Sequence, residues 1–351
     1  MRALGEQGTS LTELFTGEPR TFRVEDRSIM VDASENTIAL KVCSIRRIAE
    51  AVIAIELRGA GSTLLPPFSA GAHIPLHLAN GLIRSYSLTN SEDERERYVI
   101  AVGRDIKSRG GSQFIHEQVQ VGDVLAAGMP RNNFPYDENA AYSVFIAGGI
   151  GVTPLVSMIR RAVKLRRAWE IHYCARSRGC AAFLDEIGSL SGQKGGLRTH
   201  FDDESEGRFI DLERVIGSGP SAAHFYCCGP EPMLAAFRKA AASLTAEQVH
   251  FEYFKQVDDP ERTGGFTVRL ARRNRSVYVP PGRTILEALH AEGIDAPAAC
   301  REGVCGTCEV RVLEGVPIHR DSVLTPAERE RNQTMMICCS GSETPYLTID
   351  L

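Results

Sequence analysis

The sequence lacks the features that would assign it to nucleic-acid, membrane or exported proteins. Its 40 lysines and arginines are outnumbered by 44 aspartates and glutamates, and a formal net charge of −4 argues against nucleic acid as a partner. It contains no run of eighteen apolar residues that would cross a membrane. The opening residues MRALGEQG lack the apolar core of a signal peptide, so we expect a cytoplasmic protein.

The chain is rich in cysteine, with ten in 351 residues. In a chain of this length without an export signal, cysteines are better explained as metal ligands or buried thiols than as disulfides. The length and a hydrophobic content of 43% predict two or three globular domains.

Four of the cysteines have the spacing of an iron–sulfur site. They are Cys300, Cys305, Cys308 and Cys338. Their pattern is C-x4-C-x2-C-x29-C, and its first three members match the plant-type [2Fe–2S] ligand run. Gly303 and Gly306 allow the backbone to coil tightly around a small cluster. A structural zinc usually takes its ligands as two short C-x2-4-C units, so the cluster is favoured over zinc or plain buried thiols.

Short β-rich segments predict an antiparallel β-barrel for residues 37–138, after an N-terminal extension (1–36) to which we assign no function. Glycine, proline or asparagine separates the segments, and one helix is expected at Ser112–Val119. The expected strands are Ile38–Ser44, Val52–Leu57, His73–Leu78, Arg84–Leu88 and Tyr98–Val102.

Arg84, Tyr86 and Ser87 give this barrel the residue types of a flavin site. A guanidinium pairs with the phosphate, a tyrosine packs along the ribityl chain or ring, and a hydroxyl bonds to the N5 edge. Arg109–Gln113 is a glycine turn at a helix start, where free N–H groups hold a phosphate. Alone, this turn is better explained as a hairpin followed by a serine N-cap. The two segments together favour a flavin.

Residues 139–254 predict a parallel α/β domain that binds a nucleotide. The buried strand Val144–Ala147 leads into the turn GGIGVTP and a helix at Leu155–Leu165, so a helix N-terminus faces a pyrophosphate. This is not the dinucleotide fingerprint G-x-G-x-x-G. Further strands are expected at Trp169–Cys174, Leu197–Phe201 and His224–Cys227, with helices after the first and third.

Residues at the strand ends bear on the choice of nucleotide. Arg176, followed by Ser177, suits an adenosine 2′-phosphate, whereas Asp202 and Asp203 reject that phosphate and accept free ribose hydroxyls. The chemistry leaves the preference open, and the two aspartates favour NADH. Cys228, before a Gly-Pro turn, either abuts the nicotinamide or packs in the core.

Three histidines of this domain have neither metal-ligand spacing nor a serine partner. They are His172, His200 and His224, and we interpret them as structural.

After a polar linker at 255–264, residues 265–351 predict a compact α+β module of the plant-type ferredoxin kind. Its helix Thr284–Ala291 carries a capping box, with Thr284 as cap and Glu287 three residues on. Strands are expected at Phe266–Leu270, Arg275–Val279, Glu309–Leu313 and Met335–Cys338, with a helix after Thr325-Pro326.

Together these motifs resemble those of the phthalate dioxygenase reductase family, the reductase components of Rieske-type oxygenases, which include vanillate demethylase reductases. The resemblance covers Thr37 to Leu351 and has the family's order of flavin barrel, NAD domain and ferredoxin. It implies FMN binding by Arg84, Tyr86, Ser87, Gly111, Ser112 and Gln113. It implies nicotinamide-nucleotide contacts from Gly149, Gly151, Thr153, Cys228 and Pro230, with Phe254 beside the flavin. Gly341-Ser342 stands where relatives often continue with arginine, which leaves partner docking there open.

The resemblance implies an NADH-dependent oxidoreductase that passes electrons from NADH to FMN, to the [2Fe–2S] cluster and out to a separate Rieske-type oxygenase with a small aromatic substrate. Such a relay requires no acid–base residue, so Ser87, Cys228 and Phe254 are expected only to border flavin and nicotinamide. We expect a monomer. The alternatives are a self-contained flavin reductase for small acceptors, a non-catalytic zinc-stabilised nucleotide-binding module, and FAD in place of FMN.

Overall fold

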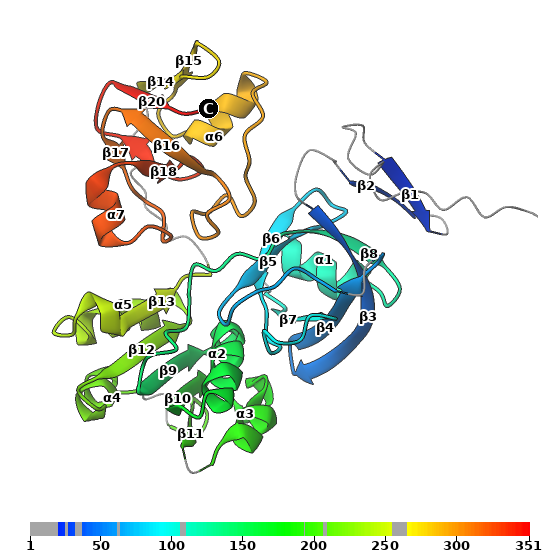
Figure 1. Ribbon diagram of the computed structural model, residues 1–351, viewed down its shortest axis with the longest axis vertical. Coiled ribbons are helices and arrows are strands. Elements are labelled where there is room, and N and C mark those ends of the chain that lie inside the picture. Colours follow the sequence, from blue (N-terminus) through cyan, green and yellow to red (C-terminus); the bar gives the residue numbers. More distant parts are fainter. Residues whose placement is uncertain are drawn as a thin grey trace, which may run out of the picture.

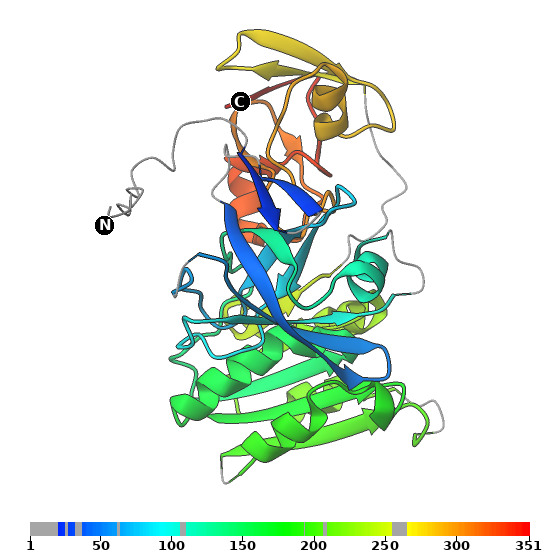
Figure 2. The ribbon, with the colours of Figure 1, turned by 90° about the vertical axis from the view of Figure 1, so that its right-hand side faces the viewer.

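The computed structural model describes residues 20–24, 27–31, 37–61, 64–105, 110–192, 194–205, 209–254 and 265–351 (Figure 1). An antiparallel pair, β1 (Arg20–Val24) and β2 (Arg27–Val31), precedes three larger units. These units are an antiparallel barrel, a parallel α/β domain and an α+β domain, so the expected fold class is confirmed (Figures 1 and 2). None of the helices in the described ranges is long and apolar enough to span a bilayer.

The barrel is a six-stranded antiparallel sheet with the order β6-β5-β8-β3-β4-β7. A bridge between Leu88 and Ile100 joins the end of β6 to β7 and closes the sheet on itself. Alternating side chains such as Leu40, Ile55 and Ile74 fill its interior and are fully buried. The elements are β3 (Thr37–Ala49), β4 (Val52–Gly59), β5 (His73–His77), β6 (Ile83–Ser87), β7 (Tyr98–Gly103), α1 (Gly111–Gln118) and β8 (Val124–Gly128).

The α/β domain contains five parallel strands in the order β11-β10-β9-β12-β13. Helices α2 and α3 cover one face, while α4 and α5 cover the other (Figure 1). The elements are β9 (Tyr142–Gly148), α2 (Val152–Lys164), β10 (Ala168–Ala175), α3 (Leu184–Leu190), β11 (Gly195–Phe201), α4 (Leu212–Ser218), β12 (Ala223–Cys228), α5 (Glu231–Ala240) and β13 (Val249–Glu252). Because the strand order reverses at β9, the ligand crevice of this sheet lies at the carboxyl ends of β9 and β12.

The C-terminal domain has a five-stranded sheet of order β15-β14-β20-β16-β18, against which α6 packs. Helix α6 begins with the expected capping box of Thr284 and Glu287. The elements are β14 (Phe266–Leu270), β15 (Arg275–Val279), α6 (Ile285–Ala291), β16 (Glu309–Glu314), β17 (Pro317–Ile318), α7 (Pro326–Arg331), β18 (Thr334–Met336), β19 (Gly341–Ser342) and β20 (Tyr346–Ile349).

The structure adds elements that the sequence patterns did not predict. Strand β8 is short and runs through the middle of the barrel sheet, so it is buried on both sides and shows no polar alternation. Helix α4 and strand β13 are also additions. Helix α2 begins at Val152, three residues earlier than predicted, because proline is tolerated in a first helical turn and Pro154 does not delay the start.

Candidate functional site

The four predicted cluster ligands lie together at the barrel-facing side of the C-terminal domain. Cys300, Cys305 and Cys308 belong to the loop before β16, and Cys338 follows β18. All four side chains are buried, with at most 6% of their surface exposed.

The loop requires its glycines. Gly303 and Gly306 have φ values of 68° and 74°, in the left-handed region that favours glycine. A Cβ on Gly303 would lie 2.5 Å from Cys339 Sγ and 3.0 Å from Asp321 Cα. Only a residue without a side chain therefore permits this close approach.

The four sulfur atoms lie close to one another. The Cys300 thiol interacts with those of Cys305 and Cys338, and Cys308 interacts with Cys338. Interactions with these neighbouring thiols lower the pKa of Cys300 and of Cys308. No three His, Cys, Asp or Glu side chains of the described residues form a group that suits a single metal ion. Four cysteine thiolates are the donor set of a [2Fe–2S] cluster.

Cys339 adjoins this set without completing it. Its sulfur contacts the Cys338 thiol and lies 3.7 Å from the Met336 carbonyl oxygen. Cys338, in contrast, reaches both Cys300 and Cys308. This arrangement suits Cys338 better than Cys339 as the fourth ligand, and that assignment stays a prediction.

The structure brings the two predicted flavin segments together. A Cβ on Gly111, at the start of α1, would lie 2.7 Å from Arg84 Cγ on β6. The guanidinium is thus held over a helix N-terminus, where free N–H groups and a positive charge suit a phosphate. Within the described residues the enclosed Ser85 hydroxyl, on the next position of β6, has no hydrogen-bond partner. These features fit a flavin mononucleotide.

The other predicted flavin residues have mixed surroundings. Tyr86 packs against the barrel core, and burial raises the pKa of its hydroxyl. Ser87 is buried, and the Ser112 hydroxyl accepts a hydrogen bond from the Asp105 N–H at 3.3 Å. The Gln113 side chain bonds to Glu117 rather than pointing to the turn. The prediction for Arg109 lies outside the described residues.

The two predicted nicotinamide-nucleotide loops are in direct contact. A Cβ on Gly151 would lie 2.2 Å from the Cys228 carbonyl oxygen, and a Cβ on Gly148 would lie 2.5 Å from Pro230 Cδ. Thr153 is buried and donates to the Ile150 carbonyl oxygen at 3.0 Å. The loops after β9 and β12 therefore form one floor at the crevice predicted by the strand order.

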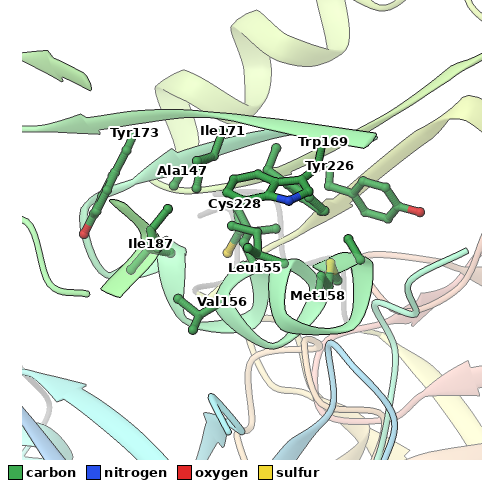
Figure 3. Packing of buried hydrophobic residues seen from close by; sticks show 14 of the residues in the cluster. Ala147, Leu155, Val156, Met158, Trp169, Ile171, Tyr173, Ile187, Tyr226 and Cys228 are labelled. Atoms are coloured by element: carbon green, nitrogen blue, oxygen red, sulfur yellow. The ribbon is translucent and has the colours of Figure 1, made fainter. Parts of the chain in front are cut away.

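Cys228 itself points into the core. Its side chain has no exposed surface and lies between the sheet and α2, near Ala147 and Leu155 (Figure 3). Burial raises the pKa of this thiol well above its usual value. In the structure Cys228 therefore packs in the core, while its approach to the nicotinamide stays a prediction.

The residues expected to select the nucleotide are neighbours at the ends of β10 and β11. The Asp202 and Asp203 N–H groups donate to the Ala175 and Arg176 carbonyl oxygens at 3.0 and 3.2 Å. The side chains of Arg176, Asp202 and Asp203 are all exposed. The positive and the negative charges are therefore both accessible to a bound nucleotide from the solvent side.

A carboxyl group that the sequence patterns did not single out lies beside this floor. Glu252 ends β13, and among the described residues its Oε2 is enclosed without a hydrogen-bond partner. Burial raises the pKa of Glu252 to about 8. Phe254, two residues on, packs partly against the domain core. The sequence offered one indication of this buried carboxyl group, because Glu252 stands among aromatic residues in the segment HFEYF.

The three histidines interpreted as structural each stack on another histidine. His172 and His200 stack with Nδ1 and Nε2 3.1 Å apart, and His224 stacks on His250 with the same distance. Burial lowers the pKa of His172 and His200.

The fold and these sites define a class: an oxidoreductase that joins nicotinamide, flavin and [2Fe–2S] chemistry in one chain. A family model described as "2Fe-2S iron-sulfur cluster binding domain" matches residues 268–342. A second, described as "Oxidoreductase NAD-binding domain", matches residues 145–239.

Similar proteins cover almost the whole chain. Phenoxybenzoate dioxygenase subunit beta of Ectopseudomonas oleovorans is 49% identical over 90% of this chain and 97% of its own length. Tetrachlorobenzoquinone reductase of Sphingobium chlorophenolicum is 46% identical over 90% and 98%. Phthalate dioxygenase reductase of Burkholderia cepacia is 36% identical over 90% and 97%.

Two solved structures are similar to this one over most of the chain. The structure of phthalate dioxygenase reductase has a TM-score of 0.66 and 36% identity, covering 90% of this chain and 98% of that one. An intact type IV self-sufficient cytochrome P450 monooxygenase has a TM-score of 0.82 and 37% identity over 94% of this chain, which spans only 43% of that longer protein.

The chain belongs to the phthalate dioxygenase reductase family. It is an oxidoreductase whose cofactors are NADH, FMN and a [2Fe–2S] cluster, as the sequence predicts.

Proposed function

We propose that this protein is the NADH-dependent reductase component of a multicomponent oxygenase, delivering electrons to a separate Rieske-type oxygenase that hydroxylates or demethylates a small aromatic substrate. The observation that carries the proposal is the contact between the cluster loop and the flavin strand. Ile83, the first residue of β6, packs against Ala299, Cys300 and Cys305. The likeness to phenoxybenzoate dioxygenase subunit beta and to phthalate dioxygenase reductase supports this partner class.

The chain's own groups account for each part of this relay. Gly149, Gly151 and the N-terminus of α2 accept the pyrophosphate of NADH, and the aspartates after β11 favour a free ribose. Arg84 and the N-terminus of α1 hold the phosphate of FMN. FMN supplies the change from two-electron hydride chemistry to single-electron transfer.

The flavin assignment is tested by Gly111→Ala. The new methyl group displaces Arg84 from the start of α1, and we expect weaker FMN binding in an equilibrium titration of the apoprotein. Gly61→Ala is the matched control, because a Cβ there meets nothing within 4 Å. Equal FMN affinity in both variants would contradict the assignment.

A second candidate function is reduction of a small quinone by this protein alone. It is favoured by the 46% identity to tetrachlorobenzoquinone reductase.

The deciding experiment mixes NADH-reduced protein with a purified Rieske oxygenase and, separately, with a substituted benzoquinone. The proposal predicts stoichiometric reduction of the oxygenase cluster, and predicts that Cys305→Ser abolishes this transfer. Quinone reduction that persists in Cys305→Ser, together with no electron delivery to any Rieske oxygenase, would instead identify a quinone reductase.

A further inference from the structure

A cavity lies at the end of the parallel sheet opposite to the nucleotide crevice. Its volume is about 470 Å³, which is within the range of small-molecule sites. It is formed where β9, β10 and β11 begin, around Tyr142, Ala168 and Gly195. Strand β9 then runs to Gly148, which places the cavity about 20 Å from the loop expected to receive the pyrophosphate. The cavity is therefore separate from the sites described above.

Basic side chains gather around this cavity. Arg166 and Arg167 come from the turn after α2, while Lys194 and Arg198 come from the beginning of β11 and the residue before it. Arg198 Nε forms an ion pair with Glu170, which also lines the cavity, at 3.0 Å. In the part of the chain that the structure describes, the other three basic side chains form no ion pair. Three positive charges therefore line the cavity without a carboxylate partner.

Two hydrogen bonds bring these charges together. Lys194 Nζ donates to the Arg166 carbonyl oxygen at 3.3 Å, and Arg167 Nε donates to the Glu138 carbonyl oxygen at 3.0 Å. Both acceptors are uncharged, so the bonds fix the side chains and leave their charges uncompensated. Basic residues beside a helix C-terminus also offset the helix dipole, which is an alternative explanation for positive charge at this end of α2.

The backbone at Arg166 argues for a more specific role. The N–H groups of Arg166 and Arg167 donate to the carbonyl oxygens of Val163 and Ala162 at 3.0 and 2.9 Å. These two bonds define a helix end at which the left-handed residue is usually glycine. Arg166 has a φ of 55°, so the chain keeps an arginine there against the backbone preference. Its guanidinium is exposed, and among the described residues it has no hydrogen-bond partner.

Aromatic rings line the same cavity. They are Tyr142 and Trp169, and Trp169 is the chain's one tryptophan (Figure 3). A Cβ on Gly195 would lie 2.3 Å from Trp169 Cε2, so the indole lies directly against the start of β11. A Cβ on Gly192 or Gly196 would meet nothing within 4 Å, so both positions border open space. The cavity thus offers ring surface next to unmatched positive charge.

We propose that this cavity is a binding site for a small organic acid, which it recognises by a carboxylate or phosphate group. A guanidinium pairs with two oxygens of such a group at once, and an ammonium adds a further donor. Arg166, Arg167 and Lys194 hold the acidic group, while the rings contact the body of the ligand. The inference does not rest on the proposed electron-transfer function, because these residues belong to none of the flavin, nicotinamide or cluster sites.

Trp169 supplies a local probe for the test, because no other tryptophan contributes to the fluorescence of the chain. The purified holoprotein is titrated at constant ionic strength with sodium benzoate and, separately, with phenyl phosphate. We expect a saturable change in tryptophan fluorescence, and the anion with the lower Kd identifies the acidic group that the site prefers. Benzyl alcohol carries the same ring without a charge and should produce no saturable change.

Two variants test the basic residues. Arg166→Gly removes the guanidinium and relieves the backbone, so the affinity for the preferred anion should fall about tenfold or more while the thermal midpoint does not fall. This combination separates a binding role from a structural one. Lys194→Gln should weaken binding in the same direction, and it provides the same readout if Arg166→Gly fails to fold.

Two control variants should bind as the wild type does. Asn274→Gly makes the matching backbone change at a φ of 48° in another domain. Arg214→Ala removes an exposed arginine from α4, on the opposite face of the same sheet.

The proposal is overturned if sodium chloride alone reproduces the fluorescence change, or if Arg166→Gly and Lys194→Gln both bind the anions with wild-type affinity. It is also overturned if saturating NAD⁺ abolishes the binding, because the anion would then occupy the nucleotide crevice. An equal loss in Arg214→Ala would refute it as well, since the overall charge of the domain rather than this cavity would then attract the anion.

Discussion

Glu252 and Cys228 are register partners at the carboxyl ends of β13 and β12, which places a buried carboxyl group beside a buried thiol. Burial raises the pKa of Glu252 from its ordinary 4.5 to about 8, so the folded protein holds a proton there that the unfolded chain releases above pH 4.5. The corresponding stability is fully present below pH 4.5 and is lost as the pH rises through 8.

The first prediction is that Glu252→Gln weakens this pH dependence. Between pH 5 and 8 the free energy of unfolding of the wild type should fall relative to the variant, by roughly 3 kcal/mol, because the pKa of Glu252 rises from 4.5 to about 8 on folding. Urea unfolding at several pH values, at equal cofactor content, measures this pH dependence of the free energy of unfolding. Glu247→Gln, at an exposed position, is the control and should follow the wild type. Identical pH profiles for Glu252→Gln and the wild type would contradict the burial argument.

The second prediction separates the two adjacent cysteines after β18. Cys338→Ser should lose the visible absorbance and EPR signal of the cluster, because Cys338 contacts both Cys300 and Cys308. Cys339→Ser should retain both signals. In Cys305→Ser the cluster should also be lost while NADH still reduces the flavin. Loss of flavin reduction in that variant would contradict the assignment of NADH oxidation and flavin reduction to the barrel and the α/β domain.

The third prediction concerns the floor of the nicotinamide crevice. Gly151→Ala places a methyl group against the Cys228 carbonyl oxygen. Because this oxygen belongs to the backbone, relieving the clash requires a main-chain shift that costs free energy. We expect a loss of about 1–3 kcal/mol in unfolding free energy and slower flavin reduction by NADH. Gly217→Ala in α4 meets nothing within 4 Å and should stabilise the protein by up to about 1 kcal/mol. Thermal unfolding and stopped-flow kinetics report the two effects.

The fourth prediction concerns the choice between NADH and NADPH. Asp203→Ser removes one of two negative charges at the end of β11, which oppose a 2′-phosphate. The ratio of kcat/KM for NADH to that for NADPH should fall about tenfold, equivalent to about 1.4 kcal/mol. Arg176→Ala should move the ratio in the opposite direction. An unchanged ratio in both variants would place nucleotide selection elsewhere.

The sequence predicts most of this architecture because its strongest signals are local. The cysteine spacing, the GGIGVTP turn and the Thr284 capping box each combine residue type with a fixed short separation. Each such segment was found in the predicted setting, at a loop, a strand end or a helix start.

What the sequence did not predict depends on contacts between distant segments. Strand β8 is identified by its neighbours β3 and β5, since VLAAG alone carries little strand pattern. Glu252 becomes distinctive only once β13 lies beside β12.

The contact between the cluster loop and the barrel also bears on the order of assembly during synthesis. Domains generally fold as units in the order in which they leave the ribosome. The barrel surface around Ile83, on which the loop packs, would therefore exist before the cysteines of residues 300–338 emerge. The newly synthesised cluster loop would then pack on a barrel surface that is already folded.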